Sequence, residues 1–216
     1  MTPLDRFHNL PARVRDEILD KHRHYNAEHI DWWDDVYEMF KHDMDAIGIE
    51  VERMYFSGFW SQGDGACFAG RVFGWPCFLK SLGYEDAALI NLASEFVFRV
   101  SHSGHYYHEN CTDFYADLPL PECADDEDFA DKYSTYEHGS LHEAVWMTNL
   151  SKYSEDRLEE QFTEAFKDHM RDLYSRLEAE YDHLTSDESV LAALDANDML
   201  TEIIDELENE YAGSEI

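Results

Sequence analysis

The segment from Tyr55 to Phe68 constrains the fold more than any other part of the chain, because its aromatic residues flank a glycine-rich turn. It reads YFSGFWSQGDGACF. Aromatic side chains gain stability when they are buried, and glycine loses more conformational freedom on folding than any other residue. Within the segment, Gln62-Gly63-Asp64-Gly65 is a turn signal, since Asp-Gly readily adopts positive φ. The segment therefore predicts a reversal of the chain between two ordered elements.

The residues on both sides of this turn alternate in polarity, which predicts strands. Ile49 to Met54 alternate with a period of two, so one strand is expected from 49 to about 60 and a second from Ala66 to about Phe73. Trp75-Pro76 is expected to end this hairpin. Residues 98–108 predict a third strand or a bent pair of strands, and Cys111 to Tyr115 a fourth. The sequence thus predicts a small antiparallel sheet formed by a hairpin at about 49–73 and strands at about 98–115.

Helical periodicity dominates elsewhere and completes an α+β fold. Helices are expected over residues 11–24, 30–46, 84–98 and 138–149, over 158–184 as one long amphipathic helix, and over 190–207, with Ser186 as the N-cap of the last. The part from 152 to 211 forms a helical C-terminal third. Because 216 residues suit one domain, residues 1–216 are predicted to form a single domain, with 116–132 as an acidic loop or insertion.

The charge of the chain limits its partners. It has 48 Asp and Glu residues against 16 Lys and Arg, a net charge of −32. Direct binding to nucleic acid depends on cations that neutralise phosphates, so neither nucleic acid nor an anionic membrane is an expected partner. A basic protein surface is attracted instead. No apolar run is long enough to span a membrane and the N-terminus lacks the pattern of a signal peptide, so a cytoplasmic location is expected.

The acidic residues of the last third are expected to face outwards, because they lie off the apolar stripe. The predicted binding residues are Glu155, Glu159, Asp168, Asp172, Glu202, Asp205 and Glu206, with Gln62 and Asp64 exposed at the hairpin turn. Acids three or four residues apart on a helix are roughly 5 to 6 Å apart, a spacing comparable to that of phosphates along a DNA strand. Repulsion between them costs a few tenths of a kcal/mol per pair. Mimicry of DNA is one explanation of why the chain tolerates this cost. The alternatives need no partner: the acids form a solvated face, suit a saline habitat or improve solubility.

Cys67 supports an enzymatic alternative. Gly63 to Phe68 resembles the Asp-Gly-Asn-Cys motif of the ovarian-tumour-type deubiquitinating cysteine proteases, although Ala66 replaces the asparagine. In that family the cysteine begins a helix, which favours a thiolate, whereas a strand is predicted for this chain. The general base would be one of several histidines: His102, His105, His108, His138 or His142. The alternative catalytic set is Cys67 with His105 and His108; the simpler interpretation is a buried cysteine of the hairpin.

The series His102, His105 and His108 suggests a second enzymatic alternative, a bound metal ion. Histidines three residues apart share one face of a helix, but Ser103-Gly104 argues against a helix here. On a strand the series needs a bend to bring all three imidazoles together, with Asp64 or Glu109 completing the site. The simpler interpretation is a polar β-rich loop. No phosphate-binding loop or dinucleotide fingerprint occurs, so no cofactor is expected, and the four cysteines are expected to be free thiols.

Three segments carry a resemblance to a family of phage and prophage proteins, some of which are labelled "antitoxin of toxin-antitoxin stability system". They are Tyr55–Phe68, His102–Glu109 and Arg171–Ser186, and Trp33–Met44 adds to the likeness. The resemblance implies a shared fold and a phage-associated origin, and it brings no catalytic residue.

Charge and resemblance together predict a phage-encoded, non-enzymatic inhibitor or regulator. It would be anti-defence or antitoxin-like and would bind a basic, nucleic-acid-handling host protein in the host cytoplasm, as a DNA mimic. The alternatives are a small hydrolase that uses Cys67 or a histidine-bound metal, and a component of the virion or its assembly. The sequence leaves open whether the chain forms a homo-oligomer.

Overall fold

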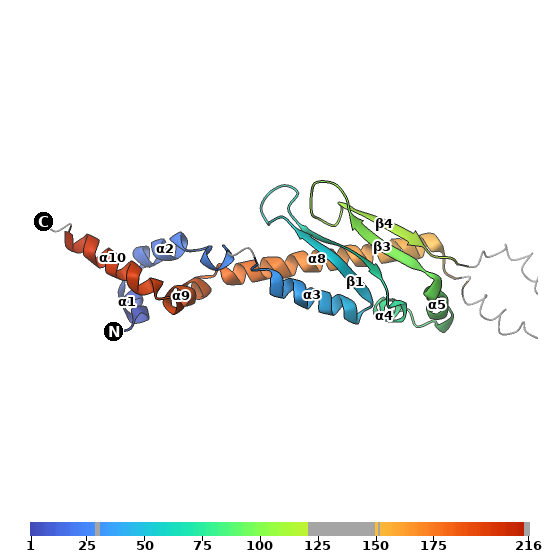
Figure 1. The fold of residues 1–216 in the computed structure, drawn as a ribbon, viewed down its shortest axis with the longest axis horizontal. Helices are drawn as coiled ribbons and strands as arrows, with labels where there is room; N and C mark the ends of the chain where they lie inside the picture. Colours follow the sequence, from blue (N-terminus) through green and yellow to red (C-terminus); the bar gives the residue numbers. More distant parts are fainter. Residues whose placement is uncertain (29–30, 121–149, 151, 214–216) are drawn as a thin grey trace, which may run out of the picture. The chain divides into compact units, whose positions relative to one another are not determined.

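The chain divides into two compact units. The structure, a computed structural model, describes residues 1–28, 31–120, 150 and 152–213. Met1–Val36 and Arg176–Ile216 form one unit, here called the terminal unit, and Tyr37–Ser175 form the other, here called the sheet unit. Figure 1 shows the elements of both units. The expectation of a single domain stays a prediction.

The sheet unit contains a four-stranded antiparallel sheet with the strand order β1-β2-β3-β4. The strands are β1 (Ile49–Phe56), β2 (Ala66–Val72), β3 (Val97–His102) and β4 (Thr112–Asp117). Each strand pairs with the next one along the chain, as in a meander (Figure 1). The predicted α+β class, with a small antiparallel sheet and a helical C-terminal part, is confirmed.

The predicted hairpin is the pair β1–β2, with Phe56 opposite Ala66. β1 is shorter than expected and ends at Phe56 rather than near Trp60. Ser57 N–H still donates to the carbonyl of Gly65, but Gly58 then takes a φ of +122°, which is open to glycine and strained for other residues. A nine-residue loop, 57–65, therefore joins the strands in place of a tight turn.

The helices of the sheet unit differ from the prediction where proline and strand signals compete. They include α4 (Trp75–Ser81), α5 (Ala87–Leu92) and the 3₁₀ helix η2 (Ala93–Glu95), and most of α3 (Asp34–Ala46). Trp75-Pro76 was expected only to end the hairpin, but Pro76 lies in the first turn of α4, where its missing N–H is not needed. The helix predicted over 84–98 ends early, because β3 already begins at Val97.

The core of the sheet unit is made of aromatic rings packed between one face of the sheet and the helices. Phe166 belongs to α8 (Glu155–Leu184), the predicted long amphipathic helix, and lies 5.6 Å from Phe68 and 5.2 Å from Phe98, centroid to centroid. Phe40 of α3 contacts the same Phe68 ring at 5.7 Å. Helices α3 and α8 thus cover the same face of the sheet, alongside which Figure 1 draws them.

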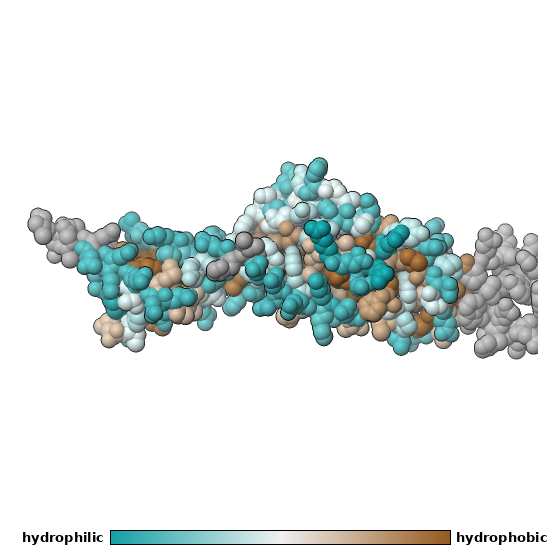
Figure 2. Space-filling view, in the orientation of Figure 1, coloured by the Kyte–Doolittle hydropathy of each residue, from teal (hydrophilic) through white to brown (hydrophobic). Residues whose placement is uncertain are grey.

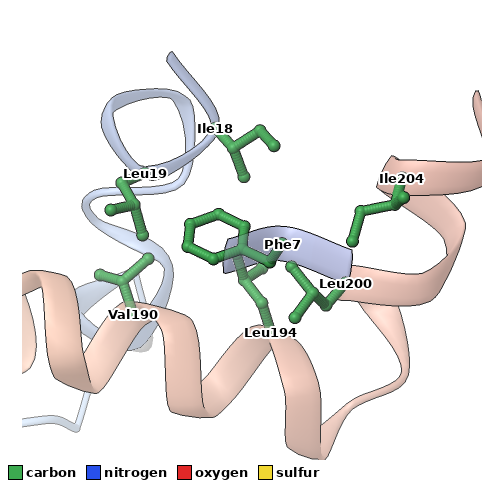
Figure 3. Close-up of a cluster of buried hydrophobic side chains, with 7 residues drawn as sticks. All are labelled: Phe7, Ile18, Leu19, Val190, Leu194, Leu200 and Ile204. Atoms are coloured by element: carbon green, nitrogen blue, oxygen red, sulfur yellow. The ribbon is translucent and has the colours of Figure 1, made fainter. Parts of the chain in front are cut away.

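The terminal unit is helical and has its own core. Its elements are α1 (Pro3–Asn9), α2 (Ala12–Lys21), the 3₁₀ helix η1 (Tyr25–Ala27), α9 (Asp187–Ala196) and α10 (Met199–Gly213), with the ends of α3 and α8. Figure 3 shows Phe7 among aliphatic side chains from α2, α9 and α10; the buried cluster is Phe7, Ile18, Leu19, Val190, Leu194, Leu200 and Ile204. The apolar periodicity of the last third therefore forms a core within this unit.

Two features of the terminal unit were not predicted correctly. The helix expected over 190–207 is two helices, since Asp198 has a φ of +60° between α9 and α10. Helix α1 was not predicted, although Thr2 and Asp5 form a capping box at its start. Ser186 does cap α9, with its hydroxyl accepting from Ser189 N–H at 3.2 Å.

Some predictions fall partly or wholly outside the described residues. The acidic loop expected over 116–132 begins later, because β4 extends to Asp117, and its residues from 121 onwards lie outside the described part. The helix expected over 138–149 also lies outside it. In the parts of the chain that the structure describes, no helix combines the length and apolarity that crossing a membrane requires.

Candidate functional site

Two loops meet at one end of the sheet and bring together the residues that the sequence singled out. The β1–β2 loop (57–65) lies against the β3–β4 loop (103–111), so closely that a side chain at Gly63 would overlap the Tyr106 ring. Beside them, Tyr55 of β1 stacks on His102 with a centroid distance of 4.6 Å. We call this region the loop end.

Asp64 organises the first of these loops. Its Oδ2 accepts hydrogen bonds from Trp60 N–H at 3.1 Å and from Ser61 N–H at 2.7 Å, and its own N–H donates to the carbonyl of Ser61. The side chain is therefore half-buried and occupied within the loop, whereas the sequence predicted it to be an exposed binding residue. Gln62 and Ser61 are exposed, as expected.

The ordered loop presents a large aromatic side chain to solvent. Trp60 is 76% exposed and the neighbouring Tyr106 is 52% exposed. Phe59, next to Trp60, packs on α8. Its ring lies 5.6 Å from the ring of Tyr174, and its carbonyl accepts a hydrogen bond from the Tyr174 hydroxyl at 3.4 Å. The loop is thus fixed to α8 while its tip faces water.

Arg171 of α8 joins the helix to the second loop. Its guanidinium donates to Glu164 at 2.8 Å, to Asp168 at 2.6 Å and to Glu109 at 3.5 Å. The hydrogen bond to Glu164, with those to the other two carboxylates, raises the pKa of Arg171 further above its ordinary value. Arg171 is therefore a cation already neutralised by its own chain.

A small cavity of about 270 Å³ lies at this junction. It is lined by Asp64, Gly65, Ala66, His108, Glu109, Arg171, Tyr174 and Ser175. Within its wall Arg171 donates to Glu109, while Asp64 accepts from the backbone of its own loop. This arrangement suits a structural junction or a small polar ligand.

A larger cavity of about 720 Å³ runs along α8 on the side of the loop Leu82–Tyr84. The Tyr84 hydroxyl is hydrogen-bonded to Gln161 within it, and Lys152 on its rim pairs with Asp86 at 2.7 Å. None of the residues predicted to be catalytic lies on its described wall.

Cys67 does not have the environment of a nucleophile. The residue is fully buried in β2, and burial raises the pKa of its thiol to about 12, so a thiolate is scarcely present at neutral pH. Tyr55 is its partner across the hairpin. The geometry therefore matches the simpler interpretation, a buried hairpin cysteine, and gives the hydrolase alternative no support. Cys67, Cys77 and Cys111 are free thiols, while Cys123 lies outside the described residues.

The histidines expected to assist Cys67 have other partners. His108 Nε2 lies 3.7 Å from the sulfur of Cys111, and its Nδ1 accepts from Asn110 N–H at 3.1 Å. With Nδ1 as acceptor, the neutral imidazole carries its proton on Nε2 and cannot take a proton from a thiol through that atom. His105 is exposed on the loop.

The three histidines of the series also point to separate places. His102 Nε2 lies 3.2 Å from the carbonyl of Tyr106, while its ring packs on Tyr55 and Tyr107. Among the described residues, no group of three or more His, Cys, Asp and Glu side chains is arranged to hold a metal ion. The metal alternative therefore has no geometric support in this part of the chain.

The predicted acidic binding residues are divided between the two units. Glu155, Glu159, Asp168 and Asp172 belong to the part of α8 in the sheet unit, and Glu202, Asp205 and Glu206 belong to α10 of the terminal unit. Asp168 pairs with Arg171, and Asp205 pairs with Arg6 at 2.6 Å. Glu159 and Asp172 are half-buried, and the others are exposed.

The acids of α8 form a ridge that the sequence analysis did not single out. Acids recur every fourth residue at Asp156, Glu160, Glu164, Asp168 and Asp172, here called the α8 carboxylate row. Successive members rise by about 6 Å along the helix. The buried stripe of α8, which includes Phe162 and Phe166, lies on the other side. Hydrophilic residues cover most of the surface in view in Figure 2, as a net charge of −32 predicts.

Sequence reasoning gave no role to Arg171, Tyr174 or Cys111, and it considered Glu109 only as a possible metal ligand. Arg171 and Glu109 are 62 positions apart, so their pairing depends on the fold and not on local spacing. The available signal was that Glu109 and Arg171 lie in the same segments that carry the resemblance to the phage proteins.

The comparisons with known proteins identify a family without adding a function. No curated protein matches the chain, and no solved structure matches it. A family model described as "Domain of unknown function (DUF8835)" matches residues 32–187, which include the whole sheet unit. The chain therefore belongs to the DUF8835 family.

Proposed function

We propose that this protein is a phage-encoded, non-enzymatic inhibitor or regulator that binds a basic, nucleic-acid-handling host protein as a DNA mimic. It acts in the host cytoplasm, in an anti-defence or antitoxin-like role. The observation that carries the proposal is the α8 carboxylate row, which holds carboxylates at regular intervals on a helix fixed to a sheet.

The row is suited to this role because it is rigid. Buried aromatic residues of α8 anchor the helix to the sheet, so the carboxylates need little ordering when a partner binds. From Glu155 to Ser175 the helix has seven acids against three basic residues. Arg171 pairs with two members of the row, Glu164 and Asp168. Asp156 and Glu160 are the exposed charges that a basic groove would meet first.

The proposal predicts a partner that DNA displaces. The full chain, immobilised, is used to capture proteins from a host lysate at about 50 mM NaCl, and elution with duplex DNA is compared with elution at about 500 mM NaCl. Each captured protein is then purified and its affinity is measured by itself. Supporting evidence is a single basic protein whose affinity falls steeply with salt and for which duplex DNA competes. Binding that is unchanged at high salt, or that DNA does not affect, would refute mimicry.

Charge-neutralising variants locate the surface. The α8 variant carries Glu155→Gln, Asp156→Asn, Glu159→Gln and Glu160→Gln, and the α10 variant carries Glu202→Gln, Asp205→Asn and Glu206→Gln. A control neutralises four other exposed acids of the sheet unit, which lie outside the candidate site: Glu38, Asp45, Glu85 and Glu95. The α8 variant is expected to weaken binding at least tenfold more than the control. Equal losses in both would mean that net charge alone attracts the partner.

A further inference from the structure

The second face of the sheet is distinct from the first, because no helix in the described part of the chain packs on it. Phe68 and Val72 of β2 point to the helices and are buried, whereas Arg71 between them is exposed. In β3 and β4, Val97 is 43% exposed and Tyr115 is 47% exposed. We call this side of the sheet the open face.

Three arginines gather on the open face of a chain that has few cations. The Arg99 guanidinium lies 4.4 Å from the centroid of the Tyr115 ring, and the Arg53 guanidinium lies 5.0 Å from that of Tyr55. Neither arginine forms an ion pair within the described residues, although acids outnumber Lys and Arg by three to one in the sequence. Stacking on tyrosine fixes their orientation and leaves their N–H groups available.

Arg71 adds electrostatic repulsion to the three-arginine cluster, which destabilises an isolated copy of the chain. It is the register partner of Arg99 across β2 and β3, and like charges directly opposite one another destabilise a sheet. Its pairing with Glu50 at 2.6 Å offsets part of this repulsion. An interacting surface that brings additional carboxylates would remove the rest.

The open face itself carries such carboxylates on its outer strands. Glu50 and Glu52 lie on β1, where the register shifts between Val51 and Arg53, and both acids interact electrostatically with Arg71. Asp113 and Asp117 lie on β4 opposite Ser101 and Val97. The face thus has three arginines against four acids, a near balance within a chain of net charge −32. Two copies of the chain repel each other through most surfaces, but much less through this one.

We propose that the open face is a self-association surface through which two copies of the chain pair face to face about a two-fold axis. In such a pairing the surface is its own partner, so the arginines of one copy meet the outer-strand acids of the other. Tyr115 and Val97 supply apolar contact, and tyrosine and arginine are enriched in protein interfaces.

The size of the open face limits the expected affinity of the dimer. Four strands spaced about 4.8 Å apart span roughly 15 to 20 Å, so the interface is smaller than that of a standard stable complex. A weak dimer is expected, with a dissociation constant on the order of tens to hundreds of micromolar. Because the overall repulsion is screened by salt, dimerisation is expected to strengthen between about 50 and about 300 mM NaCl.

Analytical ultracentrifugation of the full chain tests the proposal, from about 5 to about 500 µM protein at about 300 mM NaCl. The expected result is a reversible monomer–dimer equilibrium. A monomer at every concentration would overturn the proposal. If Tyr115 were also protected from hydroxyl-radical oxidation in that monomer, another part of the same chain would cover the open face.

Charge exchange identifies the surface. The acidic-face variant carries Arg53→Asp, Arg71→Asp and Arg99→Asp; the basic-face variant carries Glu52→Arg, Asp113→Arg and Asp117→Arg. All six side chains are exposed, so both variants are expected to fold, which circular dichroism checks. Each variant alone should dimerise at least tenfold more weakly than the wild type, and their mixture should form a one-to-one heterodimer.

A matched control reverses three exposed acids away from the open face, with Glu38→Arg, Glu85→Arg and Glu95→Arg. It makes the same change in net charge as the basic-face variant and should dimerise at least as well as the wild type. Dimers that persist unchanged in both face variants, or variants whose mixture stays monomeric, would overturn the assignment to the open face.

Discussion

The sheet unit and the terminal unit are stabilised by different kinds of packing. In the sheet unit Phe166 lies within 6.3 Å of four other aromatic rings, those of Phe68, Phe78, Phe98 and Phe114. The buried cluster of the terminal unit is aliphatic except for Phe7. The family match includes all of the sheet unit and leaves out α1, α2 and α10 of the terminal unit. The sheet unit is therefore the part that defines the family, and most of the terminal helices lie outside it.

The two units also differ in how they use their arginines. In the terminal unit Arg6 pairs with Asp205 and Glu208, and Arg23 pairs with Asp20 and Asp187. In the sheet unit Arg53 and Arg99 lie over tyrosine rings on the open face. Acids of α10 are thus partly neutralised by Arg6, and acids of α8 are partly neutralised by Arg171. The difference between the units is the pair of arginines stacked on tyrosines, which the sheet unit has on its open face.

The largest effect is expected from the aromatic core. Phe166→Ala removes the ring that is surrounded by four others and leaves a cavity, so it should lower the free energy of unfolding by about 3 to 5 kcal/mol. Urea denaturation followed by near-ultraviolet circular dichroism measures this. A loss below about 1 kcal/mol would show that the aromatic cluster is not the main source of stability in the sheet unit.

The aliphatic core should respond less and more locally. Leu194→Ala is expected to cost about 2 to 4 kcal/mol, because its side chain is fully buried in the terminal unit. Native-state amide exchange is the measurement: amides of α9 and α10 should exchange faster, and those of β2 and β3 should keep the wild-type rate. Equal acceleration in both units would show that they unfold as one, and the comparison between them would fail.

The loop end offers a test with a matched glycine. Gly63 has a φ of +92° and faces the Tyr106 ring, whereas Gly83 has a φ of +82° and faces open space. Gly83→Ala should cost about 1 to 2 kcal/mol for the left-handed conformation alone. Gly63→Ala should cost roughly 1 kcal/mol more, because the ring must move. Both costs are measured by thermal unfolding. Equal costs would show that the contact between the β1–β2 loop and the β3–β4 loop does not stabilise the protein.

Local patterns predicted much of the sheet unit because its elements have clear periods. The alternation at Ile49–Met54 and the stripe from Leu158 to Leu184 match β1 and α8. The failures are positions where one residue type supports two structures. Pro76 both ends a strand and begins a helix, and Asp198 breaks a helical pattern with positive φ in place of the usual glycine.

The candidate site was less predictable, because its contacts are not local. Cys67 was recognised as either a nucleophile or a buried residue, and only its complete burial distinguishes them. Asp64 was predicted to be exposed, but its hydrogen bonds to the loop backbone depend on a geometry that the Gly-Asp-Gly pattern does not specify. The junction of Arg171 with Glu109 joins a helix to a distant loop.

The acid stability of the sheet unit should depend on Asp86. The hydrogen bond from Lys152 lowers the pKa of Asp86 below its ordinary value of 3.8. Its contribution to stability is therefore complete above pH 3.8 and is lost as the pH falls through the lower pKa of the folded state. Asp86→Asn, which keeps the hydrogen bond to Ala88 N–H, should cost roughly 0.5 to 1 kcal/mol at pH 7 and less at pH about 3. A pH-independent difference in urea unfolding would contradict this.

The smallest effect is expected at His22 of the terminal unit, which titrates at a higher pH than Asp86. Burial lowers the pKa of the His22 imidazole below 6.5, and among the described residues its Nε2 has no hydrogen-bond partner. The unfolded chain therefore binds a proton before the folded one does, and stability should fall as the pH decreases below 6.5. His22→Gln should reduce this loss between pH 7 and pH 5.5, as measured by amide exchange in α9. If His22→Gln kept the pH profile of the wild type, acid sensitivity would not distinguish the two units, and their difference would be limited to packing.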